Sequence, residues 1–310
     1  MANNAADEVH YEEPIGNGGY EFRLELFRLR LGAGAPQLAL RAPWPAALAF
    51  GSCAAYALLV RGALSTTWWR GFARRHAAAH YAALCAYSAA CCLAAAYELG
   101  ASGEAAEFAA WLLARAGGGG AGPPRAPPAL YCRPVPKWLR LVSLSFIVSK
   151  AWEWADTLVL IAQGKSLEDI GVLHLYHHAT TVGLFFVVTS FPVTEKSGLL
   201  LNGFVHALMY FHFAFRLPRF MRPLLTGAQI AQLAAVTLAW IDCAQTCDEA
   251  IAFKRDHRLE FLLPFAAVPV YLLLFVRFFV EQYVLKTTKG RERVDGGEAA
   301  AAAAAKAKAH

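Results

Sequence analysis

Long apolar runs, separated by short polar stretches, recur along the whole chain. A transmembrane helix needs about 20 mostly apolar residues. Seven stretches approach this length: 43–60, 77–99, 138–160, 168–190, 198–217, 226–247 and 261–284. The first is short and the second is rich in alanine, so six spans are the alternative. The pattern predicts an all-α fold, a polytopic membrane bundle of about seven transmembrane helices.

The segments outside these runs are polar or rich in helix-breaking residues. Residues 1–36 are polar, and no basic stretch leads into an apolar one, so we expect no cleaved signal peptide. Residues 104–116 are too short to span and predict an interfacial or loop helix. Residues 117–128 (GGGGAGPPRAPP) predict a flexible loop. We therefore expect one transmembrane domain over 37–286 and a tail over 287–310.

Polar and ionisable side chains recur inside four of the predicted spans. Such residues are costly in a membrane and are candidates for function by default. In each span they recur at helical spacing and so lie on one face. The four sets are Lys150, Glu153, Asp156 and Thr157; His174, His177 and His178; Asn202, His206, Met209 and Tyr210; and Thr226, Gln229 and Gln232. Four polar stripes on neighbouring helices predict one shared polar chamber.

Some of these residues also have a simpler interpretation. Gln229 and Gln232 are equally well explained as contacts between helices, and Lys150 with Glu153 as a structural ion pair. Three histidines on one face, beside a fourth on another span, favour a functional site. We assign structural roles to Asp242, Gln245, His212 and Arg277, and interfacial positions to His76 and His80.

Composition agrees with a membrane location, whereas charge does not fix the orientation. The chain is 57% hydrophobic and 17% charged, which argues against a disordered protein and against a soluble globular enzyme. With seven spans and a cytosolic C-terminus, 14 Lys and Arg lie on the cytosolic side and 13 on the other. The seven cysteines lack metal-type spacing and are interpreted as small buried hydrophobic residues.

The C-terminal tail gives independent information about orientation and compartment. Lys306 and Lys308 match a KxKxx dilysine signal, which is read in the cytosol and returns proteins to the endoplasmic reticulum. An ordinary basic tail is the alternative interpretation. With the tail in the cytosol, the polar sets of the third, fourth and sixth spans fall in the cytosolic half of the membrane. The chamber is then expected to open to the cytosol.

Four motifs in order resemble those of the ELO family of very-long-chain fatty-acid elongases, which are membrane 3-oxoacyl-CoA synthases. They are KxxExxDT at Lys150–Thr157, HxxHH at His174–His178, NxxxHxxMY at Asn202–Tyr210 and TxxQxxQ at Thr226–Gln232. The resemblance covers roughly residues 130 to 285, including CRP at Cys132–Pro134. Phe211 to Phe213 depart from the family's MYxYY pattern. Asp169 replaces a Gln that is frequent in members acting on polyunsaturated chains.

The resemblance implies a decarboxylative condensation of acyl-CoA with malonyl-CoA to 3-oxoacyl-CoA, CO2 and CoA, with CoA thioester substrates and neither a bound cofactor nor a metal. No cysteine lies in the motifs, so we expect His177 to be the nucleophile and to form an acyl-imidazole. His174 and His178 would orient it or relay protons. His206, Asn202 or Tyr210 would stabilise the enolate oxyanion.

The other motif residues are expected to support this chemistry. Glu153 and Asp156 would set the histidine tautomers, and Lys150 would balance their charge. The expected substrate-binding residues are Thr157, Met209, Gln229 and Gln232, with Arg70, Arg74, Arg75, Arg216, Arg219 and Arg222 as candidates for the CoA phosphates or for lipid headgroups. Expected partners are membrane lipid, the 3-oxoacyl-CoA reductase, dehydratase and enoyl reductase of an elongation cycle, and a second copy of the chain; no nucleic acid is expected.

Two other functions would use some of the same residues. HAAAH at 76–80 and HLYHH at 174–178 imitate histidine boxes of a di-iron membrane desaturase or hydroxylase. Such a site needs about eight histidines, and only seven remain outside the termini and the loop that contains His257. The other alternative is a non-enzymatic seven-helix transporter or receptor that uses the chamber for protons or a ligand.

Overall fold

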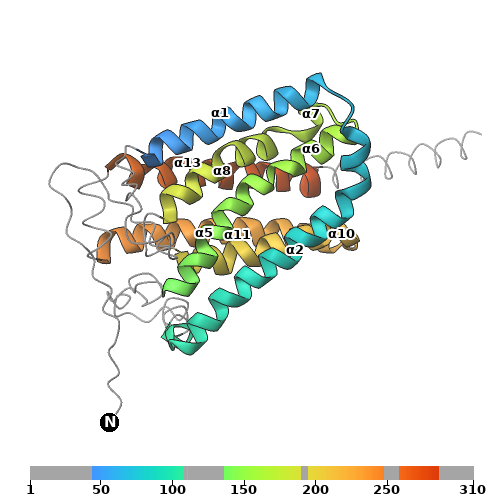
Figure 1. Ribbon diagram of the computed structural model, residues 1–310. Helices are drawn as coiled ribbons and strands as arrows, with labels where there is room; N and C mark the ends of the chain where they lie inside the picture. Colours follow the sequence, from blue (N-terminus) through green and yellow to red (C-terminus); the bar gives the residue numbers. More distant parts are fainter. Residues whose placement is uncertain (1–43, 108–109, 111–135, 190–194, 248–257, 286–310) are drawn as a thin grey trace, which may run out of the picture.

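The computed structural model describes residues 44–107, 110, 136–189, 195–247 and 258–285. Long helices lie side by side in one bundle (Figure 1), and the described residues contain no strand. In chain order the elements are α1 (Trp44–Ser65), α2 (Arg70–Ala101), α5 (Lys137–Trp152), α6 (Trp154–Ala162), α7 (Leu167–Ile170), α8 (Val172–Thr189), α9 (Glu195–Ser197), the π-helix η2 (Gly198–Asn202), α10 (Gly203–Phe215), α11 (Met221–Thr246), α13 (Arg258–Phe279) and the π-helix η3 (Val280–Leu285). The polytopic helical bundle predicted from the sequence is confirmed.

Several sequence predictions concern residues beyond these limits. The N-terminal segment 1–36, the loop 117–128 and the motif Cys132–Pro134 lie outside the described residues. The same holds for the tail 287–310 with its two lysines, and for most of the segment 104–116. The boundary between membrane domain and tail stays a prediction.

Each of the seven predicted spans coincides with a helical stretch. Four of the described stretches are long and apolar enough to cross a membrane by themselves: 70–101, 198–215, 221–241 and 261–285. A shorter apolar helix covers Ala49–Ser65. The third predicted span (138–160) is divided into α5 and α6 at Glu153. The fifth predicted span (198–217) begins as η2, which follows α9, and continues as α10. The protein is therefore a multi-pass membrane protein.

The fourth span begins later than the apolar pattern predicts. Gly171 has φ +83°, a left-handed conformation that favours glycine, and it separates α7 from α8. Ser166 and Asp169 form a capping box at the start of α7, so Asp169 caps a short helix outside the span. The span predicted over 168–190 is therefore α8 alone.

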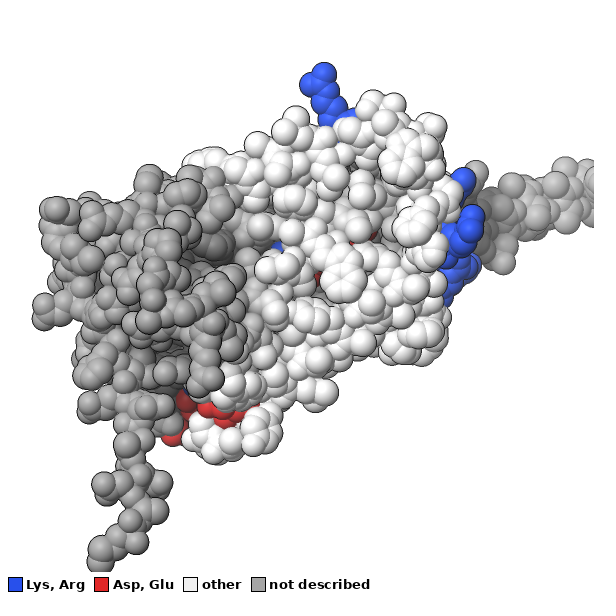
Figure 2. Space-filling view, viewed as in Figure 1, with Lys and Arg blue, Asp and Glu red and all other residues white. Residues whose placement is uncertain are grey.

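Basic side chains gather at one end of the bundle, which we call the basic end. It comprises the last turns of α1, the start of α2, the α6–α7 loop and the α10–α11 loop (Figure 1). Figure 2 shows Lys and Arg at this end and a broad uncharged band across the middle, where a few charged atoms are visible only in gaps between side chains. The opposite end, where α2 ends and α5 begins, is the far end.

Two pairs of helices approach closely enough to require small residues. A Cβ at Gly183 of α8 would meet the backbone of Ala49 in α1. A Cβ at Gly203 of α10 would lie 3.0 Å from the carbonyl oxygen of Ser88 in α2. These contacts lock α1 onto α8 and α2 onto α10, and so fix the helices that surround the polar residues.

Two features near the far end differ from the sequence predictions. Glu104, placed in an interfacial or loop helix, is buried, and its carboxylate accepts from Lys196 Nζ at 2.7 and 2.8 Å. Cys247, interpreted as a small buried hydrophobic residue, is disulfide-bonded. Cys53, Cys85, Cys91 and Cys92 are free thiols; Cys91 is buried, as expected, and the other three are partly buried.

Candidate functional site

The KxxExxDT motif places a buried ion pair at the junction of α5 and α6. Lys150 Nζ donates to Glu153 Oε1 at 2.7 Å, and the two side chains are 0% and 1% exposed. The Phe146 ring lies 4.1 Å from the same ammonium group. His206 Nδ1 of α10 lies 3.4 Å from Glu153 Oε1. The third and fifth predicted spans therefore meet at Glu153, as the chamber hypothesis required.

The three histidines of the HxxHH motif cluster on the inner side of α8. The ring centroids of His174 and His178 are 4.2 Å apart, and those of His177 and His178 are 5.4 Å apart. His177 also stacks on His206 at 6.2 Å and contacts Tyr271 at 5.3 Å. The triplet and the fourth histidine thus come together, and His177 is the member that joins them.

Thr157 is occupied by contacts within the protein. Its hydroxyl lies 2.9 Å from His174 Nε2 and 2.8 Å from the Tyr56 hydroxyl, and its side chain is buried. The Thr157 hydroxyl is therefore engaged by His174 and Tyr56, and the substrate-binding role expected from the sequence stays a prediction. Tyr56 lies in α1, outside the four motifs, and nothing in its sequence context indicated this contact.

Asp156 bridges two helices. Its Oδ2 accepts from the Tyr210 hydroxyl at 2.8 Å, and its Oδ1 lies 2.6 Å from His80 Nε2. His80, expected from the sequence at the membrane interface, is 12% exposed, and its ring turns into the bundle. His80 lies between Ala77 and Leu84 of the buried stripe of α2, and this spacing could have identified it. His76 is exposed and its Nδ1 lies 2.9 Å from its own helix's Phe72 carbonyl oxygen.

The Tyr210 contact bears on its expected role. A phenol has one hydrogen to donate, and that hydrogen points to Asp156. Asn202 lines the same cavity as His177, and His206 is the ring beside His177, so these two residues are the better placed candidates for oxyanion donors.

His177 opens onto a narrow cavity of about 90 Å³ inside the bundle. Its polar lining includes His177, Thr181, Asn202, Gln232 and Tyr271. The remaining lining is largely apolar and comes from α8, α11 and α13, including Phe185, Val236 and Phe265. Asn202 Oδ1 and Thr181 Oγ1 are buried and have no hydrogen-bond partner among the described residues. The cavity combines a histidine, unused polar atoms and an apolar continuation.

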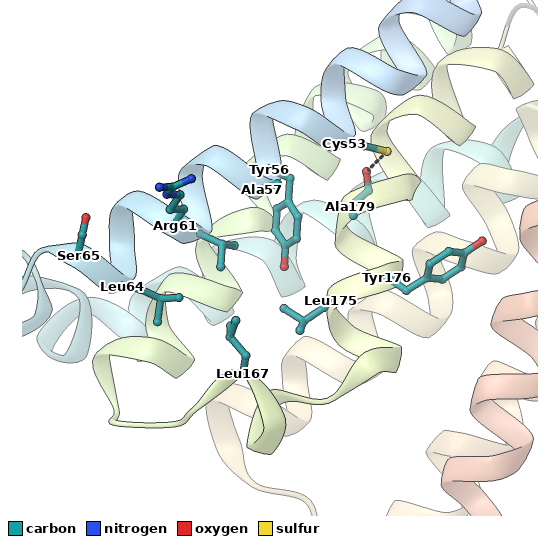
Figure 3. Close-up of a pocket in the computed structure, with 11 residues that line it drawn as sticks. Cys53, Tyr56, Ala57, Arg61, Leu64, Ser65, Leu167, Leu175, Tyr176 and Ala179 are labelled. Atoms are coloured by element: carbon teal, nitrogen blue, oxygen red, sulfur yellow. Dashed lines mark hydrogen bonds between the residues drawn. The ribbon is translucent and has the colours of Figure 1, made fainter.

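A second hollow lies on the outer side of the bundle, between α1 and the start of α8 (Figure 3). This groove measures about 710 Å³ and has mostly apolar walls, including Leu64, Leu167 and Leu175. Arg61 lies at its basic end, and the Cys53 thiol donates to the Ala179 carbonyl at 3.0 Å. None of the residues of the four motifs lines it except Leu175 and Tyr176 of HLYHH.

The remaining predicted residues lie at varying distances from the cavity. Gln232 lines it, whereas Gln229 Nε2 donates to Met209 Sδ at 3.8 Å and Thr226 contacts Tyr283 at 3.5 Å. Six arginines lie at the basic end: Arg70, Arg74, Arg75, Arg216, Arg219 and Arg222. No group of three or more His, Cys, Asp or Glu in the described part of the chain is arranged to hold a metal ion, so the di-iron alternative gains no support.

Comparison with known proteins agrees with the motifs. Residues 41–291 match the model of the ELO family, described as the GNS1/SUR4 family. "Fatty acid elongase 2" of Trypanosoma brucei brucei is 34% identical over 184 residues, 53% of this chain and 62% of that protein. "Very long chain fatty acid elongase 6" of Gallus gallus is 30% identical over 178 residues, 53% of this chain and 61% of that protein.

A third relative, "Putative fatty acid elongase 4" of Caenorhabditis elegans, is 29% identical over 167 residues, 49% of this chain and 53% of that protein. The chain thus spans little more than half the length of these curated relatives. No solved structure matches the chain significantly. The family match covers most of the chain, and the chain belongs to the ELO (GNS1/SUR4) family.

Proposed function

We propose that the protein is a fatty-acid elongase that condenses acyl-CoA with malonyl-CoA to 3-oxoacyl-CoA, CO2 and CoA. One observation carries the proposal: His177 faces a cavity that is polar beside the imidazole and apolar beyond it. The lining of this cavity suits the first carbons of an acyl chain whose thioester carbon stops at the histidine, and at about 90 Å³ the cavity must widen to take a long chain. The relatives that match the chain are named as fatty acid elongases, which supports the same activity.

In the first step a ring nitrogen of His177 attacks the thioester carbonyl of acyl-CoA. The C–S bond breaks, the chain is held as an acyl-imidazole, and the thiolate of CoA takes the proton that the imidazole loses. The neighbouring rings of His178 and His206 keep the His177 imidazole in place. Covalent catalysis of this kind replaces one difficult step by two easier ones.

In the second step malonyl-CoA loses CO2 and forms an enolate, whose carbon attacks the acyl-imidazole. The developing oxyanion needs hydrogen-bond donors that are already in place. The Asn202 amide, which lines the cavity, and His206 are the nearest candidates. Glu153 Oε1 lies 3.4 Å from His206 Nδ1, and the bond from Lys150 offsets the charge of this carboxylate.

The arginines of the basic end are suited to the phosphates of CoA. CoA would then bind at that end, and the acyl chain of the substrate would extend towards the far end. If the tail lies in the cytosol, as its predicted dilysine signal requires, the proposed active site faces the cytosol, and we propose the endoplasmic reticulum membrane as its location. The reductase, dehydratase and enoyl reductase of an elongation cycle are the expected partners.

The test is an elongation assay on membranes that contain the protein, with labelled malonyl-CoA and acyl-CoAs of several lengths. We expect labelled 3-oxoacyl-CoA from the wild type. We expect at least a 100-fold loss in His177→Gln, whereas the control His76→Gln, an exposed histidine, stays within twofold. A hydroxylamine-sensitive acyl-enzyme should form in the wild type and not in His177→Gln.

The outcomes separate the function from the assigned nucleophile. An inactive wild type with every chain length would contradict elongase activity. An active His177→Gln would retain the function but remove His177 as nucleophile. About two irons per purified chain would favour the desaturase or hydroxylase alternative.

A further inference from the structure

His80 reaches the buried motif residues from the side of the bundle. Its Nε2 lies 2.6 Å from Asp156 Oδ1, and the other carboxylate oxygen accepts from the Tyr210 hydroxyl at 2.8 Å. The exposed fraction of the side chain is 12% for His80 and 4% for Asp156, and Tyr210 is fully buried. Three residues on α2, α6 and α10 thus form one hydrogen-bonded series that leads from a partly exposed ring to a buried phenol.

The series ends beside the proposed catalytic histidines. The ring centroids of Tyr210 and His206 are 5.8 Å apart, and those of His206 and His177 are 6.2 Å apart. The rings that pack on His80 are Tyr81 at 5.3 Å and Trp152 at 6.0 Å, and neither carries a charge.

Asp156 is the acidic group that His80 contacts. The other charged groups of the motif are Lys150 and Glu153, and they are bonded to each other at 2.7 Å. Asp156 has no cation within bonding distance among the described residues other than His80 in its protonated form. The charge on Asp156 is therefore coupled to the proton on His80.

The proposed condensation needs such a connection, and a role for His80 in it depends on the proposed function. Acyl-CoA, the malonyl-CoA carboxylate and one proton give 3-oxoacyl-CoA, CO2 and CoA thiol. The first step balances without an external proton, because the imidazole proton passes to the CoA thiolate. In the second step the new C–C bond displaces His177 as an imidazolate, which must take up the proton. One proton must therefore enter the buried site in each turnover.

We propose that His80 is the outer residue of the proton path that serves this second step. Its Nδ1 takes a proton from water and its Nε2 passes one to Asp156, from which Tyr210 delivers it towards His206 and His177. Histidine suits this task because its ordinary pKa lies near working pH, and carboxylate–histidine chains serve as proton relays in membrane proteins. His80 acts through Asp156 and touches no reacting atom, so it is a positioning residue.

The test compares His80→Gln, which can still donate to Asp156 but cannot relay a proton, with His76→Gln one turn earlier on α2. We expect kcat of His80→Gln to fall by about 10- to 100-fold while KM for malonyl-CoA stays within about twofold. The first-turnover release of one CoA per chain should persist, because the first step takes up no external proton. The loss should be larger at pH 8 than at pH 6, since free protons replace the path at lower pH.

A second variant separates proton transfer from folding. His80→Ala should regain activity when imidazole is added, and His76→Gln should match the wild type throughout. Wild-type kcat in His80→Gln at pH 8 overturns the proton path and leaves the elongase function intact. The proton path is also overturned if His80→Gln loses the same activity in both steps and at both pH values, and if imidazole does not rescue His80→Ala. A purely structural role of His80 predicts that result. An inactive wild type removes the function and the path together.

Discussion

The charged residues of the KxxExxDT motif have partners inside the bundle, and the partners decide what a substitution costs. Lys150 and Glu153 are both buried and bonded at 2.7 Å. Removing one member of a buried ion pair leaves an uncompensated charge and costs about 3–5 kcal/mol, whereas an apolar replacement of both is often close to neutral. The pair is therefore more sensitive to single than to double substitution.

We expect Lys150→Met and Glu153→Gln each to lower the stability of the protein by about 3–5 kcal/mol. The double variant should be less destabilised than the sum of the two, because neither charge is left alone. Thermal unfolding in detergent measures all three variants. Additive effects would show that the two side chains do not interact.

Asp169 provides a residue-scale prediction outside the spans. Its Oδ2 accepts from the Ser166 hydroxyl at 2.7 Å and from the Ser166 backbone N–H at 3.0 Å, and these bonds lower its pKa below the ordinary value. A carboxyl whose pKa is lower when folded stabilises the fold above its unfolded pKa of about 3.9, and this contribution is lost as pH falls through the folded pKa.

Hydrogen exchange of residues 166–170 should therefore be slow at neutral pH and lose protection below about pH 4. Asp169→Asn should show weaker protection at neutral pH and no further loss on acidification. Exposed Glu168, the preceding residue, offers the control Glu168→Gln, which should behave as the wild type. Identical pH profiles for Asp169→Asn and the wild type would contradict a role of the carboxylate in the cap.

At the scale of elements, α1 and α8 pack closely through small residues. Gly62 of α1, which contacts no neighbouring helix, provides a matched control. A Cβ at Gly183 would meet the Ala49 backbone, whereas a Cβ at Gly62 of α1 would have no atom within 4 Å. Gly183→Ala should lower stability by roughly 1–3 kcal/mol because α1 must move away from α8. Gly62→Ala should raise it by about 0.5–1 kcal/mol, because glycine is costly inside a helix.

Apparent unfolding temperatures of the two alanine variants test the tight packing of α1 on α8. Opposite signs are expected, and the Gly183 variant should also elute earlier on size exclusion if α1 detaches. Equal shifts for both variants would mean that α1 and α8 do not approach as closely as the structure places them.

The elements and most of the site were predictable from the sequence, because period and apolarity carry that information. The helical spacing of His174, His177 and His178 placed them on one face, and the structure gathers them. Tyr56 and Tyr271 were not identified, because each acts through a partner far along the chain. Glu104 was missed for the same reason, since only the fold brings it to Lys196, 92 residues away. His80 was not identified either, although its spacing along α2 places it beside the buried stripe.

Helix bounds were less predictable where backbone conformation overrides composition. Residues 168–170 looked continuous with the following apolar run, but the left-handed Gly171 ends the first helix. The depth of each polar group within the bundle also depends on tertiary contacts. Whether Met209 touches a substrate or packs in the core with Tyr81 and Tyr210 is decided by helix rotation, which the sequence pattern alone leaves open.

At the scale of the whole molecule, the two ends of the bundle differ chemically. The basic end carries the exposed arginines, and η3, the last element that the structure describes, ends there (Figure 1). Cys247, which follows α11 at the far end, is disulfide-bonded. Disulfides persist in oxidising compartments such as the lumen of the endoplasmic reticulum. The disulfide and the predicted dilysine signal therefore favour the same orientation, which the count of 14 against 13 basic residues did not decide.

This orientation predicts which loops can be glycosylated. An Asn-X-Thr acceptor inserted in the 117–128 segment, between α2 and α5, should receive a glycan, because α2 ends and α5 begins at the far end and that end should face the lumen. The same acceptor placed after residue 290 should stay unmodified. Each variant is compared before and after glycosidase treatment by its shift on a gel. A glycosylated tail with an unmodified 117–128 segment would contradict the proposed orientation. The arginines of the basic end would then face the lumen and could not bind CoA from the cytosol.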